Sequence, residues 1–199
     1  KSAATFTQVT TGLTTLVGDA EVNGLIQATR SNITDQKAAQ VASKAKSIGR
    51  AYQDKLINGD GTSDTITGLL SLVAGGQTKT GAANGSDLTY DLLDETIDLV
   101  TDKDGEVDYM MMNARTIRSY YALLRTLGGA NIGEVITLPS GKQVPAYRGI
   151  PIFRNDYIPV TQTRGTSSAC TSILMGTLDD GSMSHGIAGL TASANSGIS

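Results

Sequence analysis

The clearest pattern of apolar and polar positions in this chain lies between Val107 and Gly129. The short apolar run Val107–Met112 predicts a buried strand. Asn113 follows it and predicts a helix N-cap, because its side chain can accept hydrogen bonds from the free amides of a first helical turn. Apolar residues then recur every three or four positions, which predicts a helix with one buried stripe made of Ile117, Tyr120, Tyr121, Leu124 and Leu127. Gly128 and Gly129 are typical of the end of such a helix.

A hairpin is predicted next. Val135–Leu138 has the composition of a strand, and the turn Pro139–Lys142 carries proline early and glycine late, as a type I turn does. The returning strand is predicted to cover Gln143–Phe153. Pro145 and Pro151 have no N–H to donate, so we expect these strands at a sheet edge or paired on one side only. Together these patterns predict an α+β module of strand, helix and long hairpin.

The longest helical pattern predicts one continuous helix from Asp35 to Ile57, about 35 Å long. One face carries Val41, Ala45, Ile48, Tyr52 and Leu56, while cations occupy the other faces at Lys37, Lys44, Lys46, Arg50 and Lys55. Asn58 and Gly59 end the pattern. The apolar stripe is thin, which favours a helix that covers a sheet or a neighbouring subunit. An ordinary surface helix is the alternative interpretation.

Weaker patterns fill the rest of the chain. Phe6–Val17 alternates like a strand, and Leu88–Val100 predicts a helix capped by Asp87 with a buried face of Tyr90, Leu93, Ile97 and Val100. Beyond Pro159 we expect a mobile polar loop at Thr161–Ser168, strands at Cys170–Met175 and His185–Leu190, and a polar tail at Thr191–Ser199.

Composition limits the classes of protein that fit. The 199 residues are enough for one or two domains with a buried core. A net charge of −3 does not indicate a strongly basic surface for nucleic acid. The single cysteine excludes an internal disulfide, and no apolar run approaches the roughly 20 residues that span a bilayer.

Candidate chemistry is sparse. The acidic glycine loops at Asn58–Asp64, Asp102–Asp108 and Asp179–Gly181 lack the ligand spacing of an EF-hand, so ordinary turns are predicted. Cys170 and His185 are the only thiol and the only imidazole, and no activating motif surrounds either. One histidine and one cysteine also argue against zinc. We therefore predict no catalytic, cofactor or metal site and a protein that is not an enzyme.

Several stretches, in order, resemble the major capsid proteins of tailed phages, the family with the fold of phage Hong Kong ninety-seven. The helix Asp35–Ile57 resembles its spine helix, and Ile57–Gly61 with Gly68–Leu70 resembles the glycine-rich exit from that spine. Leu88–Val100 resembles the first helix of the axial domain. Later matches are Tyr109–Asn113 with its helix, Gly149–Ile152, Asp156–Pro159 and Leu174–Gly176. The similarity covers Asp19 to Leu190.

The resemblance implies an α+β phage major-capsid-type fold: a long spine helix in a peripheral domain, and an axial domain of mixed sheet and flanking helices. Residues 1–58 would belong to the peripheral domain and residues 59–190 to the axial domain, with the tail 191–199 returning to the peripheral domain. We interpret Phe6–Val17 as the root of the family's extended loop.

In function, the resemblance implies a structural subunit that assembles with copies of itself, as pentamers and hexamers, into an icosahedral shell around a DNA genome. Scaffolding, portal or decoration proteins would be further partners; the DNA would be enclosed without sequence-specific binding, and no membrane would take part. The protein would be located in the virion capsid after assembly in the host cytoplasm. Lys44, Arg50 and Lys55 are candidates for inter-subunit salt bridges, or are simply solvated.

Two alternatives stay open. The nearer one is an encapsulin, a nanocompartment shell protein with the same fold that holds a cargo enzyme instead of a genome. The distant one is a hydrolase that uses Cys170 and His185.

Overall fold

The computed structural model describes residues 12–30, 35–62, 65–73, 75–126, 134–179, 181 and 186–189. Two compact units can be distinguished: unit 1 includes the described residues up to Ser71, and unit 2 covers Leu72–Gly189. Each unit is described by itself. The predicted boundary between a peripheral and an axial domain at Gly59 stays a prediction, and the tail 191–199 lies outside the described residues.

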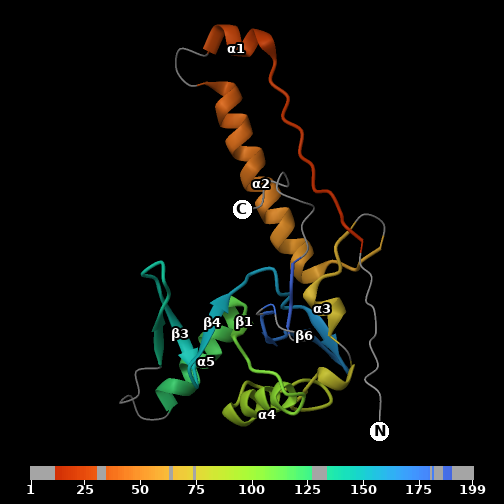
Figure 1. Cartoon of the computed structure of the whole chain (residues 1–199), viewed down its shortest axis with the longest axis vertical. Coiled ribbons are helices and arrows are strands. Elements are labelled where there is room, and N and C mark those ends of the chain that lie inside the picture. The colour runs from red at the N-terminus through yellow and green to blue at the C-terminus, as the bar shows by residue number, and fades with distance from the viewer. Residues whose placement is uncertain are drawn as a thin grey trace. The chain divides into compact units, whose positions relative to one another are not determined.

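Unit 1 is built around one long helix, α2, at Gln36–Asn58, preceded by the short helix α1 at Gly24–Arg30 (Figure 1). Asp35 caps α2, because its carboxylate accepts hydrogen bonds from the amides of Lys37 at 2.9 Å and Ala38 at 3.2 Å. The predicted continuous helix Asp35–Ile57 is therefore confirmed within one residue at each end.

The segment before α1 is not the strand predicted at Phe6–Val17. Residues 12–23 have no regular structure, and the first part of the prediction lies outside the described residues. A strand requires a partner ladder, and none of the described residues offers one here. The extended segment instead approaches α2, where the Ile48 side chain lies against Gly18.

The exit from α2 is a close backbone crossing of two glycines. The Gly68 amide donates to the Gly59 carbonyl at 2.8 Å, and a Cβ on Gly59 would stand 2.6 Å from the Lys55 carbonyl oxygen. Asp60 closes the loop between them: its carboxylate accepts from the hydroxyl of Thr65 at 2.6 Å and that of Thr62 at 2.8 Å. The helix α3 that follows is only Leu69–Leu72.

Unit 2 contains a five-stranded mixed sheet in the order β2-β3-β4-β1-β7 (Figure 1). The strands are β1 Tyr109–Met112, β2 Val135–Thr137, β3 Gln143–Tyr147, β4 Ile150–Arg154 and β7 Leu174–Gly176. β1 pairs in parallel with β4, while the other neighbours are antiparallel. A two-stranded hairpin, β5 Gln162–Arg164 and β6 Ser167–Cys170, and the 3-10 turn η1 Gly75–Gln77 complete it. The predicted α+β class with a mixed sheet is confirmed.

The core of unit 2 lies between one face of this sheet and two helices, α4 Tyr90–Thr101 and α5 Ala114–Thr126. Alternation along β1 places Met110 and Met112 on the same face, and the register sets Met110 beside Ile152 of β4. α4 contributes Leu93 and Ile97 to the same cluster, as their spacing predicted, and α5 contributes Tyr120. Full burial of each large apolar side chain contributes about 1.5–3 kcal/mol.

The start of α5 directly after β1 is as the sequence predicts. The Asn113 side-chain oxygen accepts from the amides of Arg115 at 2.8 Å and Thr116 at 3.1 Å, so the predicted cap is confirmed. Tyr120 is 2% exposed and its hydroxyl donates to the Ala146 carbonyl at 2.8 Å, which links α5 to β3. The prediction that Tyr121 shares the buried stripe is wrong, because Tyr121 is 42% exposed.

The predicted returning strand Gln143–Phe153 is two strands. Arg148 and Gly149 have φ angles of 52° and 80°, and this left-handed pair forms a tight turn between β3 and β4. The prediction that these strands lie at a sheet edge or pair on one side only is wrong for the strands, because β3 and β4 each have a neighbour on both sides. Each proline itself has a register partner on one side only, Pro145 with Val135 of β2 and Pro151 with Ala146 of β3, so the missing N–H is tolerated.

Other local predictions need correction. Thr161–Ser168 is not an unstructured loop, because most of it forms the β5–β6 hairpin. The predicted strand Cys170–Met175 is divided between β6 and β7, which belong to different sheets. Thr89 caps α4, not Asp87, because the Thr89 hydroxyl accepts from the Leu92 amide at 3.2 Å. Of the predicted strand His185–Leu190, only Gly186–Gly189 is described, and it forms a single bridge from Ile187 to Leu178.

Tyr120→Phe should destabilise the protein by about 1 kcal/mol, because the buried Ala146 carbonyl loses its donor. Tyr121→Phe, one position away on the exposed side, is the matched control and should change the free energy of unfolding by a few tenths of a kcal/mol at most. Urea unfolding measures both. Equal shifts for the two variants would contradict the assigned packing of α5.

The hydroxyls of Thr65 and Thr62 lower the pKa of Asp60 to about 2. A carboxyl with a lowered folded-state pKa stabilises the fold above its unfolded pKa, near 3.9, and this stabilisation is lost as the pH falls toward 2. The side-chain carboxyl resonance of Asp60 should therefore titrate near pH 2, and Asp60→Asn should remove that step. A midpoint near 4 in the native protein would show that the loop does not bind the carboxylate.

Candidate interaction surface

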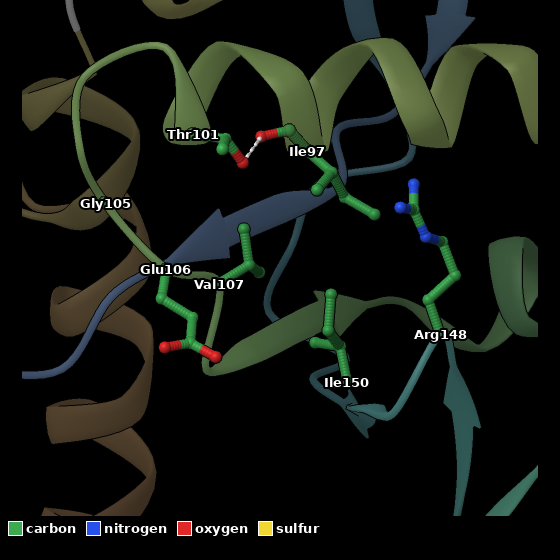
Figure 2. Close-up of a pocket in the computed structure, with 7 residues that line it drawn as sticks. All are labelled: Ile97, Thr101, Gly105, Glu106, Val107, Arg148 and Ile150. Carbon is green, nitrogen blue, oxygen red and sulfur yellow. Dashed lines mark hydrogen bonds between the residues drawn. The ribbon is translucent and has the colours of Figure 1, made fainter.

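One hollow of about 390 Å³ lies in unit 2 where the end of α4 meets the start of β1 (Figure 2). Its lining combines the aliphatic side chains of Ile97, Val107 and Ile150 with the polar residues Thr101, Glu106 and Arg148. The Thr101 hydroxyl, the one hydroxyl in the lining, donates to the Ile97 carbonyl at 3.1 Å. None of these lining residues forms a nucleophile–base pair, so the hollow has no paired groups for nucleophilic catalysis.

Arg148 belongs to a small polar network beside this hollow. Its guanidinium lies 3.1 Å from the Asp94 carboxylate, which also accepts from the Tyr147 hydroxyl at 2.9 Å. Burial, followed by that hydrogen bond, raises the pKa of Tyr147 well above its usual value. Burial likewise raises the pKa of Tyr120 to about 12. The phenols thus stay neutral and hold the β3–β4 turn, with its left-handed Arg148, against α4 and α5.

The thiol and imidazole considered for hydrolysis are not brought together among the described residues. The Cys170 sulfur lies 3.5 Å from the Asn84 carbonyl oxygen and 3.6 Å from the Ser167 hydroxyl. His185 lies outside the described residues. Within the described ranges no cluster of three or more metal-binding side chains occurs. In the same ranges no helix is long and apolar enough to cross a bilayer.

The three candidate contact residues on α2 are all exposed, but they do not share one face. Lys44 and Lys55 are eleven residues apart, three helical turns, and Lys37 is seven residues before Lys44, so these three form one row along the helix. We call Lys37, Lys44 and Lys55 the basic row. Arg50 is offset from the row and lies on another side of α2.

The basic row runs beside uncovered apolar residues. Val41 is 55% exposed and Tyr52 is 45% exposed, and both belong to the apolar stripe that the periodicity predicted. Of the 23 residues in α2, only Ile57 is fully buried. Among the described residues no carboxylate forms a salt bridge with a cation of the basic row. The cations of the basic row and the apolar side chains of Val41 and Tyr52 are therefore exposed on α2.

α4 carries the opposite charge. Its side away from the core holds Asp91, Asp94, Glu95, Asp98 and Asp102, which we call the acidic face. Neighbours on this face are three or four residues apart, so their charges repel. Asp98 and Asp102 also stand at the helix C-terminus, where the backbone dipole disfavours anions, and no basic residue occupies the last turn.

Only part of this charge is compensated. Lys79 pairs with Glu95 at 3.1 Å and Arg148 pairs with Asp94, both as exposed salt bridges. Among the described residues, no salt bridge reaches Asp91, Asp98 or Asp102. The uncompensated like charges and the anions at the C-terminus therefore lower the intrinsic stability of α4.

The long helix α2 and the α+β unit were compared with known protein families through the sequence of the chain. A family model described as the SU10 major capsid protein matches residues 13–135, more than half of the 199 residues. The chain belongs to the SU10 major capsid protein family. This confirms the resemblance on which the sequence-based assignment depends, over the spine helix, α4, β1 and α5.

A solved structure has a similar fold. It is the holo-SrpI encapsulin complex from Synechococcus elongatus PCC 7942, with a TM-score of 0.63 and 24% sequence identity. The match covers 80% of this chain and 50% of the encapsulin chain, so this chain spans about half the length of that relative. No curated protein matches the sequence.

The acidic face of α4 is the feature that the sequence analysis missed. Its signal was present in the sequence, since Asp91, Glu95, Asp98 and Asp102 follow the spacing of a single helical face. The apolar positions of that helix predict its buried face, whereas the acidic face appears only from the charged positions between them.

Asp98→Asn should stabilise the dispersed capsid protein by about 0.5 kcal/mol, because it removes repulsion from Asp94 and Asp102 and an unfavourable charge near the helix C-terminus. Asp91→Asn is the matched control: Asp91 is in the first turn, where an anion is favourable, so no gain is expected. Chemical denaturation measures both. Destabilisation by Asp98→Asn would show that a cation already satisfies this carboxylate in the single subunit.

Proposed function

We propose that this member of the SU10 major capsid protein family forms the core of a shell subunit that assembles into an icosahedral phage capsid around the DNA genome. The observation that carries the proposal is the surface of α2. It is a 23-residue helix with Val41 and Tyr52 about half exposed along one side and one fully buried residue. Contacts with other subunits would bury this surface in a shell.

The proposal includes the domain assignment made from the sequence. Residues up to Asn58 would form part of a peripheral domain around the spine helix α2, and residues 59–190 would form an axial domain that gathers at five-fold and six-fold positions. Pentamers and hexamers of one chain type close a container because each subunit repeats the same contacts. Lys44, Arg50 and Lys55 are proposed to contribute to these contacts as inter-subunit salt bridges.

The protein is proposed to act mechanically and not as an enzyme. Copies of itself would be its principal partners, with scaffolding, portal or decoration proteins at particular stages. A net charge of −3 supports enclosure of DNA without sequence-specific binding, because tight phosphate binding requires several cations on one surface. Assembly would take place in the host cytoplasm and the product would be the virion capsid.

An encapsulin-type nanocompartment is the second candidate, since the matched solved structure is an encapsulin complex. The two candidates share a fold and differ in what the shell encloses. The Cys170 and His185 hydrolase has no supporting contact among the described residues, and is not proposed.

Expression of the full-length protein, with and without a scaffolding protein, tests the proposal. Electron microscopy and sedimentation should reveal closed shells of uniform size. Nuclease-protected DNA in particles from infected cells would support the phage capsid, while a co-purified enzyme would support the nanocompartment. Only monomers under every condition would contradict a shell function of either kind.

A further inference from the structure

We infer that the basic row of α2 binds the acidic face of α4 in a second copy of this chain. The inference rests on the proposed shell function and names the surface that one subunit offers to the next. It also narrows the set of candidate salt-bridge residues, because Lys44 and Lys55 lie in the row and Arg50 does not.

Charge complementarity is the first argument. α2 carries five basic residues and one acidic residue, Asp54, whereas α4 carries four acidic residues and no basic one. A chain with a net charge of only −3 therefore separates its charges onto two helices of opposite sign. Such patches orient subunits during encounter and disfavour wrong registers, because like charges then oppose each other.

The spacing of the charges is the second argument. Lys44 and Lys55 are eleven residues apart, and so are Asp91 and Asp102. At 1.5 Å per residue each pair spans about 16 Å along its helix. When α2 and α4 of two copies lie side by side, Lys44 and Lys55 can therefore face Asp91 and Asp102 at the same time. Glu95 and Asp98 lie between these two acidic residues on α4.

The internal repulsion of α4 is the third argument. Its like-charged neighbours and the anions at its C-terminus weaken the helix, and Asp91, Asp98 and Asp102 have no cation partner among the described residues. A row of lysines on the adjacent subunit removes this repulsion. Exposed ion pairs are weak singly, but a closed shell repeats them at every equivalent interface.

Charge reversal tests the inference in the full-length protein. The first variant is Lys44→Glu with Lys55→Glu, and the second is Asp91→Lys with Asp98→Lys. All four positions are exposed, and circular dichroism verifies that each variant folds. Each variant alone should assemble about tenfold less than the wild type, because like charges then face each other across the interface.

The matched control is Lys46→Glu with Lys103→Glu. It makes the same change in net charge, but Lys46 is on the opposite side of α2 from the basic row and Lys103 follows α4. Assembly of this variant should stay near the wild-type level. A loss equal to that of the first variant would attribute the effect to net charge and overturn the inference.

Mixing the two reversed variants shows whether the contact joins two copies. Among the residues without a salt bridge, the first variant leaves the basic row and the acidic face both net negative, and the second leaves both net positive. The two variants should therefore assemble together although neither assembles alone. Recovery in the chain with all four substitutions, but not in the mixture, would place the contact within one chain and overturn the inference. Unchanged assembly combined with lost DNA retention in the first variant would assign the row to nucleic acid and also overturn it.

The same variants separate this inference from the shell function. If wild-type subunits assemble and the reversed variants assemble equally well, the shell function stands and the inference fails. If the wild type forms no shells, sedimentation of the mixed variants still decides: the mixture should associate more strongly than either variant alone at 0.1 M salt and lose this association at 1 M salt. Equal association in all samples would overturn the inference.

Discussion

The packing of α4 and α5 against one face of the mixed sheet is the contact on which unit 2 depends. Met110 and Met112 alternate onto that face, Ile152 joins them through the parallel pairing of β1 with β4, and the two helices cover them with Leu93 and Tyr120. The helices directly precede and follow β1 in the sequence, and the pairing of β1 with β4 adds Ile152 from a distant part of the chain. The unit completes a core with its own residues.

The long helix of unit 1 follows a different principle. A helix in a folded protein gains most of its stability from burial of an apolar face, yet α2 keeps only Ile57 fully buried and leaves Val41 and Tyr52 exposed. The charges of the two units extend this contrast, because among the described residues no salt bridge reaches the basic row of α2 or Asp91, Asp98 and Asp102 of the acidic face. The exposed surface of α2 agrees with membership in the SU10 major capsid protein family, because the subunits of a shell bury part of their surface against one another.

Sequence reasoning succeeded where one local signal decides the structure. The cap at Asn113, the periodicity of α2, and the buried spacing of Leu93 and Ile97 each depend on residues within a few positions of one another. It failed where pairing decides: the left-handed pair Arg148–Gly149 divides one apparent strand into two, and β6 and β7 separate although their residues are nearly continuous. Strand pairing is set by distant partners, which a single sequence does not show.

The basic row and the acidic face could likewise be predicted only in part from the sequence. Lys44 and Lys55 were identified correctly as exposed residues of a long helix, but their shared row and the complementary face of α4 emerge only when helix spacing is applied to the charged positions as well as to the apolar ones. In the proposed shell function, the exposed surfaces of α2 and α4 would act when subunits meet.

Hydrogen–deuterium exchange in dispersed subunits and in assembled shells tests this account most directly. In dispersed subunits the amides of α2 should exchange rapidly while those of β1 are protected, because only β1 has a completed core around it. On assembly the exchange of α2 should slow by about tenfold or more, with little change in β1. Equal protection of α2 in both states would contradict the proposal that other subunits cover the exposed side of this helix.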